Sequence, residues 1–366
     1  MSKRQRLSFF HFEGLPDEIL LKIFSLLDIK GVLQCGQISK RLRDISNDKS
    51  LWLKLNLTGR EVPFDFIAKA VENGCEYLNL NLSWVTGSKK SEVPWKLKHL
   101  EISLTVLDPR DSLYCYKESA RADLVGVLQN CHFLQKLAVD GLILFLDEIE
   151  LICQNGKTLQ NLSLDRCNID YYHRTELIKK LFTSCPQLTE LNISNSRGPM
   201  NNNKSCIWLY PHISALVDNL APNILKLNLS FQNCLRDKHV ETLVSRCKKI
   251  TELDLSSTKI TNDSLKSIIK HLTSLEKMDI SYTNIDVSML LQLKLIPKLK
   301  ILHCRFSEEN TKKIKNLKLQ LPHISINEVY QKLNIADPNF WENRTNPQDI
   351  FPSTLILGPP GSPDGP

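Results

Sequence analysis

The chain has 366 residues, of which 42% are hydrophobic and 24% charged, and its formal net charge is +7. This length allows two or three domains or one long repeat array, and the composition is that of a globular protein. No apolar run approaches the roughly 20 residues that span a bilayer, which argues against a membrane protein. The mild positive charge suits an acidic or phosphorylated partner, although an ordinary solvated surface is the simpler explanation.

The first residues of the chain are basic and include Lys3, Arg4 and Arg6. No long apolar stretch and no small-residue cleavage site follow them, so we expect no signal peptide. The three basic residues are compatible with a nuclear address, but such short clusters are common. We therefore expect residues 1–11 to be a flexible basic end.

A short and strongly apolar helix is predicted to begin at Pro16, a residue that suits the first helical position. Asp17 and Glu18 favour the positive end of that helix. Leu21 and Leu26 widen its apolar stripe well beyond one face. The stripe itself consists of Ile19, Leu20, Ile23, Phe24 and Leu27.

An apolar segment at 31–39 and a basic segment at 39–45 follow, and DKSLW closes the unit at 48–52. Together with the first helix they predict a three-helix unit of only some 40 residues, which rarely buries enough apolar area to stand alone. One side can pack on the next part of the chain through Leu51 and Trp52. The remaining apolar face then needs another protein.

From Trp52 onward the chain repeats a heptad of the form L-x-x-L-x-L-x. Successive copies start mostly 20 to 29 residues apart, with two longer steps of 37 and 36 residues, and this spacing is typical of leucine-rich repeats. The eleven copies are WLKLNLT (52–58), YLNLNLS (77–83), LKHLEIS (97–103), LQKLAVD (134–140), LQNLSLD (159–165), LTELNIS (188–194), ILKLNLS (224–230), ITELDLS (250–256), LEKMDIS (275–281), LKILHCR (299–305) and, more weakly, LPHISIN (321–327).

The alternation inside each heptad predicts a strand with one buried face. The segments 237–247 and 262–272 have the apolar spacing of helices. We therefore expect an α/β fold in which residues 53–327 form a right-handed solenoid of ten to eleven repeats with a parallel sheet on its concave face.

Two segments leave this repeat frame. The stretch at 196–211 is predicted to be a long loop that either folds over the concave face or hangs free. Residues 328–366 form a tail that can fold back along the sheet. Its last segment, GPPGSPDGP at 358–366, lacks core-forming residues and is expected to be disordered.

The eleven cysteines include no CxxC pair, so the sequence predicts neither a metal site nor a disulfide framework. Cys131, Cys185 and Cys247 each precede a heptad by three residues, and we expect them to be buried thiols in a reducing compartment. No catalytic motif stands out and no cofactor is implied, so we expect a protein that is not an enzyme. Nucleus and cytoplasm are the expected locations.

Residues 12–52 resemble an F-box in four places: an aromatic residue at position 12, LPDEILLKIFSLL, the Ser-Lys-Arg of 39–41 and the D-x-S-L-W of 48–52. Leu42 departs from the pattern, because many F-boxes have tryptophan there. An F-box followed by leucine-rich repeats is typical of the F-box/leucine-rich-repeat family of ubiquitin-ligase substrate receptors. The resemblance implies an F-box that docks on the adaptor linking such proteins to a cullin. The implied contact residues are Phe12, Leu15, Pro16, Ile19, Leu20, Ile23 and Phe24.

The repeats of this family present substrate. In one member the C-terminal repeats bind a small cyclin-kinase subunit that supplies recognition of a phosphothreonine, so we expect phosphorylated cell-cycle proteins as substrates, with or without such a helper. Between Lys294 and Lys318 the sequence has eight basic and two acidic residues, which favours this end as the binding site. For Trp84 and Phe231, binding and gap filling are equally open. The candidate binding residues are Lys277, Tyr282, His303, Arg305 and Phe306.

Four other functions compete with this one. The first is a repeat scaffold that binds proteins without degrading them, and the second is an enzyme. The third is a nucleic-acid binder, which would need lysines on one continuous face with aromatic platforms, whereas acidic residues are interspersed through most of this chain. The last is a receptor for a small molecule in the concave cleft.

Overall fold

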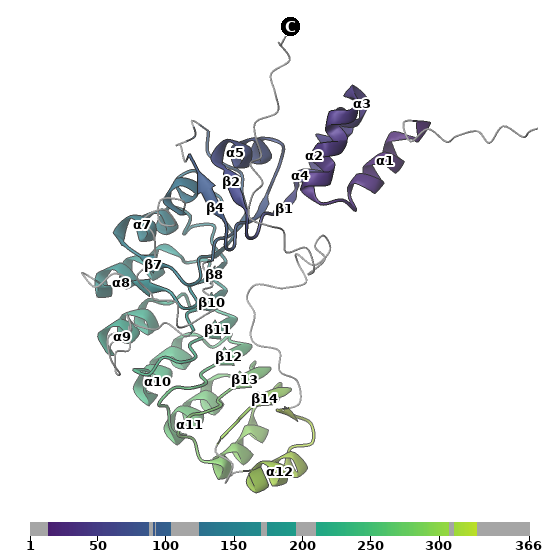
Figure 1. Cartoon of the computed structure of the whole chain (residues 1–366). Helices are drawn as coiled ribbons and strands as arrows, with labels where there is room; N and C mark the ends of the chain where they lie inside the picture. Colours follow the sequence, from purple (N-terminus) through teal and green to yellow (C-terminus); the bar gives the residue numbers. More distant parts are fainter. Residues whose placement is uncertain are drawn as a thin grey trace, which may run out of the picture.

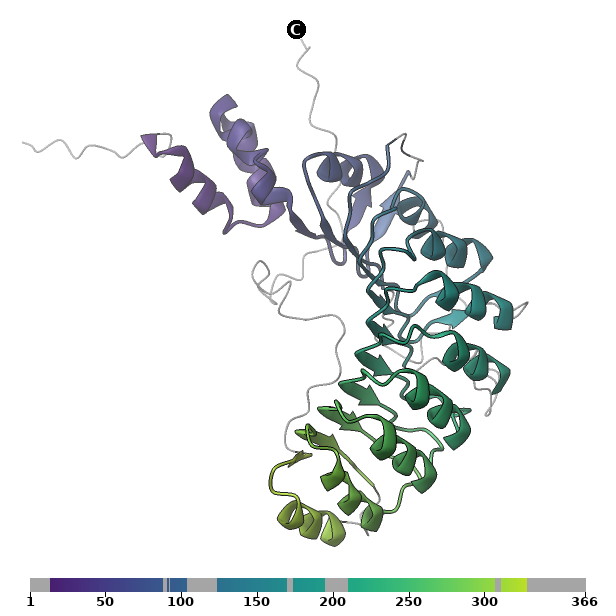
Figure 2. The same ribbon diagram turned by 180° about the vertical axis from the view of Figure 1, so that it is seen from behind.

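The computed structural model describes residues 14–87, 91, 93–103, 124–169, 174–194, 210–306 and 311–327. A small group of helices stands at the N-terminal end of a curved solenoid, whose strands line the inner side and whose helices line the outer side (Figures 1 and 2). Within the described part of the chain, no helix is long and apolar enough to cross a membrane. The predictions for residues 1–11 and 328–366 and for most of the 196–211 loop lie outside the described residues.

The N-terminal group contains the three expected helices and one short extra turn. Polar side chains fix three of the helix starts: Asp28 accepts from the Gly31 amide at 2.8 Å, Ser39 from Leu42 at 3.3 Å, and Asp48 from Ser50 at 2.9 Å. The helices are α1 (Asp17–Phe24), α2 (Ile29–Ile38), α3 (Lys40–Ser46) and α4 (Lys49–Trp52).

The expected parallel sheet is confirmed, and in the described part of the chain it has eleven strands that follow one another in chain order. Each strand is short because only the middle of each heptad pairs with its neighbours. The strands are β1 (Lys54–Asn56), β3 (Tyr77–Asn79), β5 (His99–Glu101), β6 (Lys136–Ala138), β8 (Asn161–Ser163), β10 (Glu190–Asn192), β11 (Lys226–Asn228), β12 (Glu252–Asp254), β13 (Lys277–Asp279), β14 (Ile301–His303) and β15 (Ser325–Ile326).

The frame of two heptads is wrong by two residues. Tyr77 pairs with Lys54, so the second heptad begins at Cys75, and Leu82 is exposed instead of buried. At the other end Ile326, not Ile324, pairs with Leu302. A slip of two keeps every side chain on the same face of a strand, which is why the alternation of leucines allowed both frames.

The outer helices cover the sheet and complete each repeat. They are α5 (Phe64–Glu72), α7 (Leu146–Gln154), α8 (Arg174–Ser184), α9 (Tyr210–Asn219), α10 (Asp237–Arg246), α11 (Asn262–His271), the 3₁₀ helix η3 (Val287–Leu295) and α12 (Thr311–Gln320). Two small parallel sheets, β2 (Glu61–Pro63) with β4 (Trp84–Thr86) and β7 (Ile143–Leu144) with β9 (Asn168–Ile169), lie at the strand-to-helix connections.

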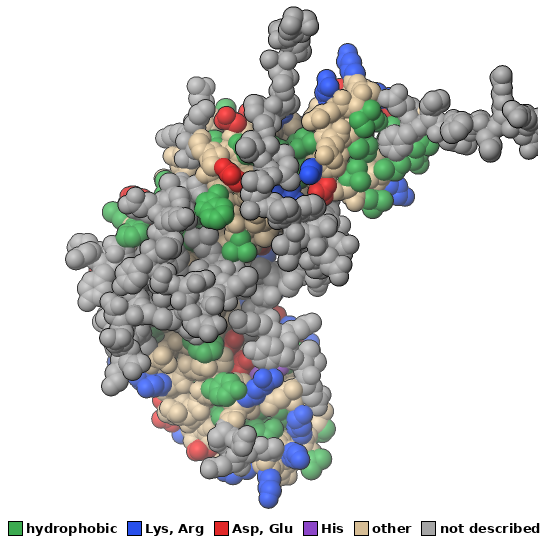
Figure 3. All heavy atoms as spheres, viewed as in Figure 1, with side chains coloured by type: hydrophobic (Ala, Val, Ile, Leu, Met, Phe, Trp, Pro, Cys, Tyr) green, Lys and Arg blue, Asp and Glu red, His purple; other side chains and the backbone are tan. Residues whose placement is uncertain are grey.

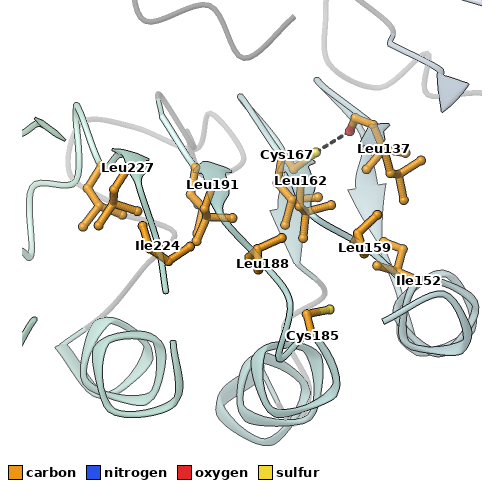
Figure 4. Packing of buried hydrophobic residues seen from close by; sticks show 14 of the residues in the cluster. Leu137, Ile152, Leu159, Leu162, Cys167, Cys185, Leu188, Leu191, Ile224 and Leu227 are labelled. Atoms are coloured by element: carbon orange, nitrogen blue, oxygen red, sulfur yellow. Dashed lines mark hydrogen bonds between the residues drawn. The ribbon is translucent and has the colours of Figure 1, made fainter. Parts of the chain in front are cut away.

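One continuous hydrophobic core runs through the solenoid between the sheet and the outer helices. Figure 4 shows Leu137, Leu162, Leu191 and Leu227 in a row, one from each of four consecutive strands, and all four are fully buried. Full burial of a leucine contributes roughly 2 kcal/mol. No single repeat can bury such a face alone, so the repeats are stable only as a stack.

The cysteines that precede the heptads belong to this core. Cys131, Cys185 and Cys247 are fully buried, as the repeat frame predicted. Burial raises the pKa of the Cys185 thiol to about 12, so it stays protonated at neutral pH and packs as a small apolar group.

The core also joins the N-terminal helices to the first repeat. Trp52 ends α4 immediately before β1, is buried, and donates its indole N–H to the carbonyl of Ser46 at 2.8 Å. Its ring lies 6.1 Å from the ring of Phe66 on α5. This contact confirms the expected packing of the unit on the repeats through Leu51 and Trp52.

Candidate functional site

The N-terminal helices expose large apolar side chains to solvent. Exposed fractions are 45% for Ile19, 83% for Leu26 and 70% for Ile38, and Pro16 at the start of α1 is exposed as well. Figure 3 shows hydrophobic side chains gathered over these helices. Scattered exposed leucines are normal, but several on a unit of this size indicate a protein-binding face. Ile19, Leu26 and Ile38 are named the hook face below.

The structure corrects two of the predicted contact residues. Leu20 and Phe24 are fully buried in the core of the chain, so the prediction that they touch an adaptor directly is wrong. They lie four residues apart on one side of α1 and hold that helix in place. Leu15 and Ile23 are half-buried. Phe12 lies outside the described residues.

An arginine holds the start of α1 against α3. The Arg41 guanidinium donates from Nε at 2.9 Å and from Nη2 at 2.5 Å to Oδ1 of Asp17, and Nη2 also donates to the Leu15 carbonyl at 2.6 Å. Two donors on one carboxylate oxygen fix the direction of the guanidinium. Leu42, which stands where many F-boxes have tryptophan, is buried beside it in the sequence. The contact therefore sets the angle at which α1 presents Ile19.

On the concave face, the side chains in the middle of the strands are largely used by the fold. Position 5 of each heptad holds Asn or Asp in most repeats. In Asn192, Asn228, Asp254 and Asp279 the side-chain oxygen accepts the amide N–H two residues later, at 2.8 to 3.0 Å. These turns fix the backbone where each strand ends. These four side chains are therefore used by the fold.

Position 3 of the heptads forms a row of alternating charges. The Lys226 ammonium lies 3.0 Å from Glu190 and 3.9 Å from Glu252, and Lys277 lies 3.4 Å from Glu252. Burial opposes the charged form of Lys226, but the hydrogen bond and charge of Glu190 and the charge of Glu252 outweigh it and raise its pKa. Lys277 ends this row, because Ile301 pairs with it on the next strand.

Three of the predicted binding residues come together where β13 and β14 end. The Tyr282 amide donates to the Arg305 carbonyl at 2.7 Å, and the Arg305 amide donates to the Ser281 hydroxyl at 3.0 Å. The side chains of Tyr282 and Arg305 are exposed, and Phe306 and His303 are half-buried. Lys277 lies at the opposite end of its strand, so the structure separates it from this group.

In most of the described repeats, the residue after the heptad has an unusual backbone conformation. It has positive φ in Gly59, Gly141, Ser257, Phe231 and Tyr282, and its amide donates to the carbonyl at position 7 of the next repeat in each case. Positive φ is unfavourable for a bulky side chain, and glycine avoids the cost. Arg166 and Leu82 share this conformation.

Aromatic residues at such a position therefore bring no benefit to folding. Phe231 has φ of 63° and is 48% exposed, and Tyr282 has φ of 58° and is 63% exposed. Neither fills a gap in the core, and the same chain uses glycine at Gly59 and Gly141. Strain at an exposed aromatic residue is a signal of function. For Phe231, this exposure argues against gap filling, and binding stays a prediction.

A half-buried carboxyl, that of Asp140, follows strand β6. Oδ1 of Asp140 accepts from the Ser163 hydroxyl at 2.6 Å and from the Asp165 amide at 2.8 Å. Burial, with a smaller contribution from the charge of Asp165, raises the pKa of Asp140 to about 6. A raised pKa gives stability that is present below the unfolded pKa of 3.8 and is lost as the pH rises through about 6.

The variant Asp140→Asn keeps the acceptor oxygen and removes the charge. We expect it to raise the free energy of unfolding by roughly 2 kcal/mol at pH 7, with little change near pH 4. Urea unfolding at the two pH values measures the difference. Equal effects at both values would show that the ionised carboxylate carries no penalty.

Comparison with known proteins identifies both parts of the chain. A family model described as F-box-like matches residues 12–58, and one described as the SKP2 LRR domain matches residues 115–351. The chain belongs to the SKP2 LRR family. This confirms the F-box/leucine-rich-repeat family expected from the sequence. SLWLKLNLTG at 50–59 and LPHISIN near the end also resemble S-phase kinase-associated protein 2.

Individual relatives match over short segments. The F-box protein dre-1 of Caenorhabditis elegans is 33% identical over 94 residues, which are 25% of this chain and 9% of the relative. The human F-box only protein 15 is 32% identical over 88 residues, 24% of this chain and 17% of the relative. The matches therefore span less than a fifth of either relative. The crystal structure of an internalin from Listeria monocytogenes has a TM-score of 0.39 and 13% identity, covering 88% of this chain and all of the internalin chain.

Proposed function

We propose that the chain is the substrate-recognition subunit of a SKP1–cullin–F-box ubiquitin ligase. The observation that carries this proposal is the hook face, three exposed apolar side chains on helices that an F-box-like family model matches. A solenoid cap should present a polar outer surface, and this one does not. Apolar anchors on a short helix suit burial in the groove of a partner protein, here a SKP1-type adaptor.

The chain itself contributes no bond-making chemistry in this proposal. No group of three or more His, Cys, Asp or Glu side chains that could hold a metal occurs among the residues the structure describes. A receptor of this kind acts by holding its substrate beside the ubiquitin-conjugating enzyme, which raises the effective concentration of the reacting groups. The curved solenoid separates the hook face at one end from the strand ends of β13 and β14 toward the other (Figure 1).

We place the substrate at those strand ends, on Tyr282, Arg305 and Phe306, with His303 at the border of the site and Lys277 outside it. The exposed guanidinium of Arg305 suits a phosphorylated residue, and the exposed ring of Tyr282 suits an apolar neighbour. Phosphorylated cell-cycle proteins fit this chemistry, with or without a small cyclin-kinase subunit. Nucleus and cytoplasm remain the proposed locations.

Exchange of Tyr282 for glycine tests this site without disturbing the fold, because glycine adopts its φ of 58° without strain. We expect the double variant Tyr282→Gly with Arg305→Ala to lose at least about tenfold in the recovery of substrates. The measurement is quantitative mass spectrometry of proteins that co-purify with the chain in cells whose cullin is inhibited. Phosphopeptides in the same samples report the modification of the captured proteins.

Ser257→Gly is the matched control, because Ser257 has the same positive φ, 54°, and lies after β12, on the repeat that precedes Tyr282. It should leave the captured proteins unchanged. Equal recovery by the double variant would place the substrate elsewhere. Captured proteins that do not become longer-lived when the chain is depleted would favour the non-degradative scaffold instead.

A further inference from the structure

The C-terminal end of the solenoid has an exposed basic surface that the proposed function does not use. It consists of Lys294 and Lys298 at and after the end of η3, Lys312 and Lys315 on α12, and the exposed side chains of Leu295 and Leu319; we name these six residues the terminal surface. Helices η3 and α12 pack against each other at this end (Figures 1 and 2). Figure 3 shows basic side chains gathered there.

Helix α12 contributes some side chains to the core and others to the terminal surface. Leu317 is buried and Ile314 packs against the core. Lys312, Lys315 and Leu319 follow the spacing of one helix face and are all exposed, Leu319 at 80%. An apolar side chain this exposed, framed by two lysines, contributes nothing to the stability of the solenoid.

The lysines of the terminal surface form no close ion pair within the described residues, although the charge of Lys298 helps to lower the pKa of Glu276. Other lysines of the solenoid lie 2.7 Å from a carboxylate of a neighbouring repeat, as Lys98 does from Glu76 and Lys300 from Glu276. The four lysines of the terminal surface have no ion pair with any residue that the structure describes. Exposed lysines around an apolar patch favour an acidic partner.

This surface is distinct from the proposed substrate site. Helix α12 continues the row of outer helices, whereas Tyr282 and Arg305 follow strands of the inner sheet (Figure 2). In the sequence Arg305 lies between Lys300 and Lys312, so the basic residues near the C-terminal end form one continuous stretch. The fold splits it into two surfaces on different layers.

We propose that the terminal surface binds an acidic segment of a partner protein that also carries leucine-like side chains. Charge complementarity selects the acidic residues, and Leu295 and Leu319 select the apolar ones. A nucleic acid is less suited, because all four cations are lysines and no aromatic residue of the terminal surface can stack on a base. A membrane surface is less suited as well, because two leucines offer little apolar area for insertion.

Fluorescence anisotropy with the full chain tests this proposal. The probe is a fluorescein-labelled peptide that repeats Glu-Glu-Leu-Glu, and the second probe has glutamate in place of every leucine. We expect the first probe to bind, the second to bind more weakly, and both to weaken as salt increases from roughly 50 mM to 200 mM. The triple variant Lys298→Glu, Lys312→Glu, Lys315→Glu should weaken binding of the first probe at least about tenfold.

The matched control reverses three exposed lysines of earlier repeats, Lys238→Glu, Lys248→Glu and Lys259→Glu, with the same change in net charge. It should retain most of the binding, and thermal unfolding confirms that both variants fold. Leu319→Ser should weaken only the probe that contains leucine. Equal loss in the two triple variants, no binding at low salt, or tighter binding of an oligothymidine or of phosphatidylserine vesicles would overturn the proposal.

Discussion

Replacement of Ile19 with aspartate and Leu26 with serine should weaken the binding of a purified SKP1-type adaptor by at least about 100-fold, while the thermal unfolding midpoint of the chain stays unchanged. Both side chains are exposed, so the exchange removes apolar anchors without opening the core. Truncation of a central anchor typically costs 2 kcal/mol or more, and about 1.4 kcal/mol corresponds to a factor of ten in affinity. Isothermal titration calorimetry with the full chain measures the effect.

Leu146→Ser provides a control for the loss of an exposed leucine, because this side chain lies on α7, away from the N-terminal helices. It should bind the adaptor as the unchanged chain does. Variants at Leu20 or Phe24 are unsuitable, since both are buried and their loss would unfold α1. Undiminished adaptor binding by the Ile19 and Leu26 variant would show that the hook face does not bind the adaptor.

Trp52→Ala should cost about 3 to 5 kcal/mol of the free energy of unfolding, the usual range for truncating a buried aromatic residue. Trp52 lies where the core of the N-terminal helices meets that of the first repeat, and it contacts both Ser46 and the ring of Phe66. We therefore also expect the helices to unfold before the repeats in this variant. Urea unfolding followed by hydrogen exchange resolves the two events.

Trp52→Phe separates packing from hydrogen bonding at the same position. It keeps an aromatic ring and loses the indole donor to Ser46, so the expected cost is smaller, about 1 to 2 kcal/mol including the lost area. If Trp52→Ala is no more costly than Trp52→Phe, the tryptophan does not join the two parts. Unfolding of the repeats and the helices in a single transition would likewise contradict the expected order.

The sequence predicted the repeat architecture because each heptad places leucines on one side of a strand, as Leu162 and Leu191 illustrate. The sequence did not determine the first residue of a repeat where apolar residues continue to alternate beyond the heptad. Leu78, Leu80 and Leu82 alternate without a break, and only the pairing of Tyr77 with Lys54 selects the register. That choice depends on a neighbouring repeat and not on local pattern.

The sequence predicted the helices of the hook face, but it did not predict which of their side chains are exposed. Helix α1 is apolar on most of its surface, so spacing alone cannot say which residues turn inward. Packing on α3 selects Leu20 and Phe24 for the core and leaves Ile19 exposed. Ile38 was missed because its place at the end of α2, directly before the cap at Ser39, becomes clear only from the helix boundary.

At the strand ends, too, the sequence predicted only part of the binding features. Aromatic residues after the heptads are visible in the sequence, and Tyr282 was predicted to bind because it also lies beside the basic stretch. Their positive φ was not visible, and it is the feature that separates Tyr282 and Phe231 from residues that fill gaps. The bonds of Asn228 and Asp254 to their own backbone were equally hidden, so the central concave face looked more available than it is.

Hydrogen exchange of the full chain, with and without a SKP1-type adaptor, tests the central claim most directly. We expect slower exchange of backbone amides in α1 and α2 when the adaptor is present, with the strands from β10 to β14 unchanged. Helix termini and short helices exchange readily when uncovered, so protection there reports a partner seated on the hook face. No protection of α1 and α2, or protection confined to the repeats, would contradict the claim that this face is completed by another protein.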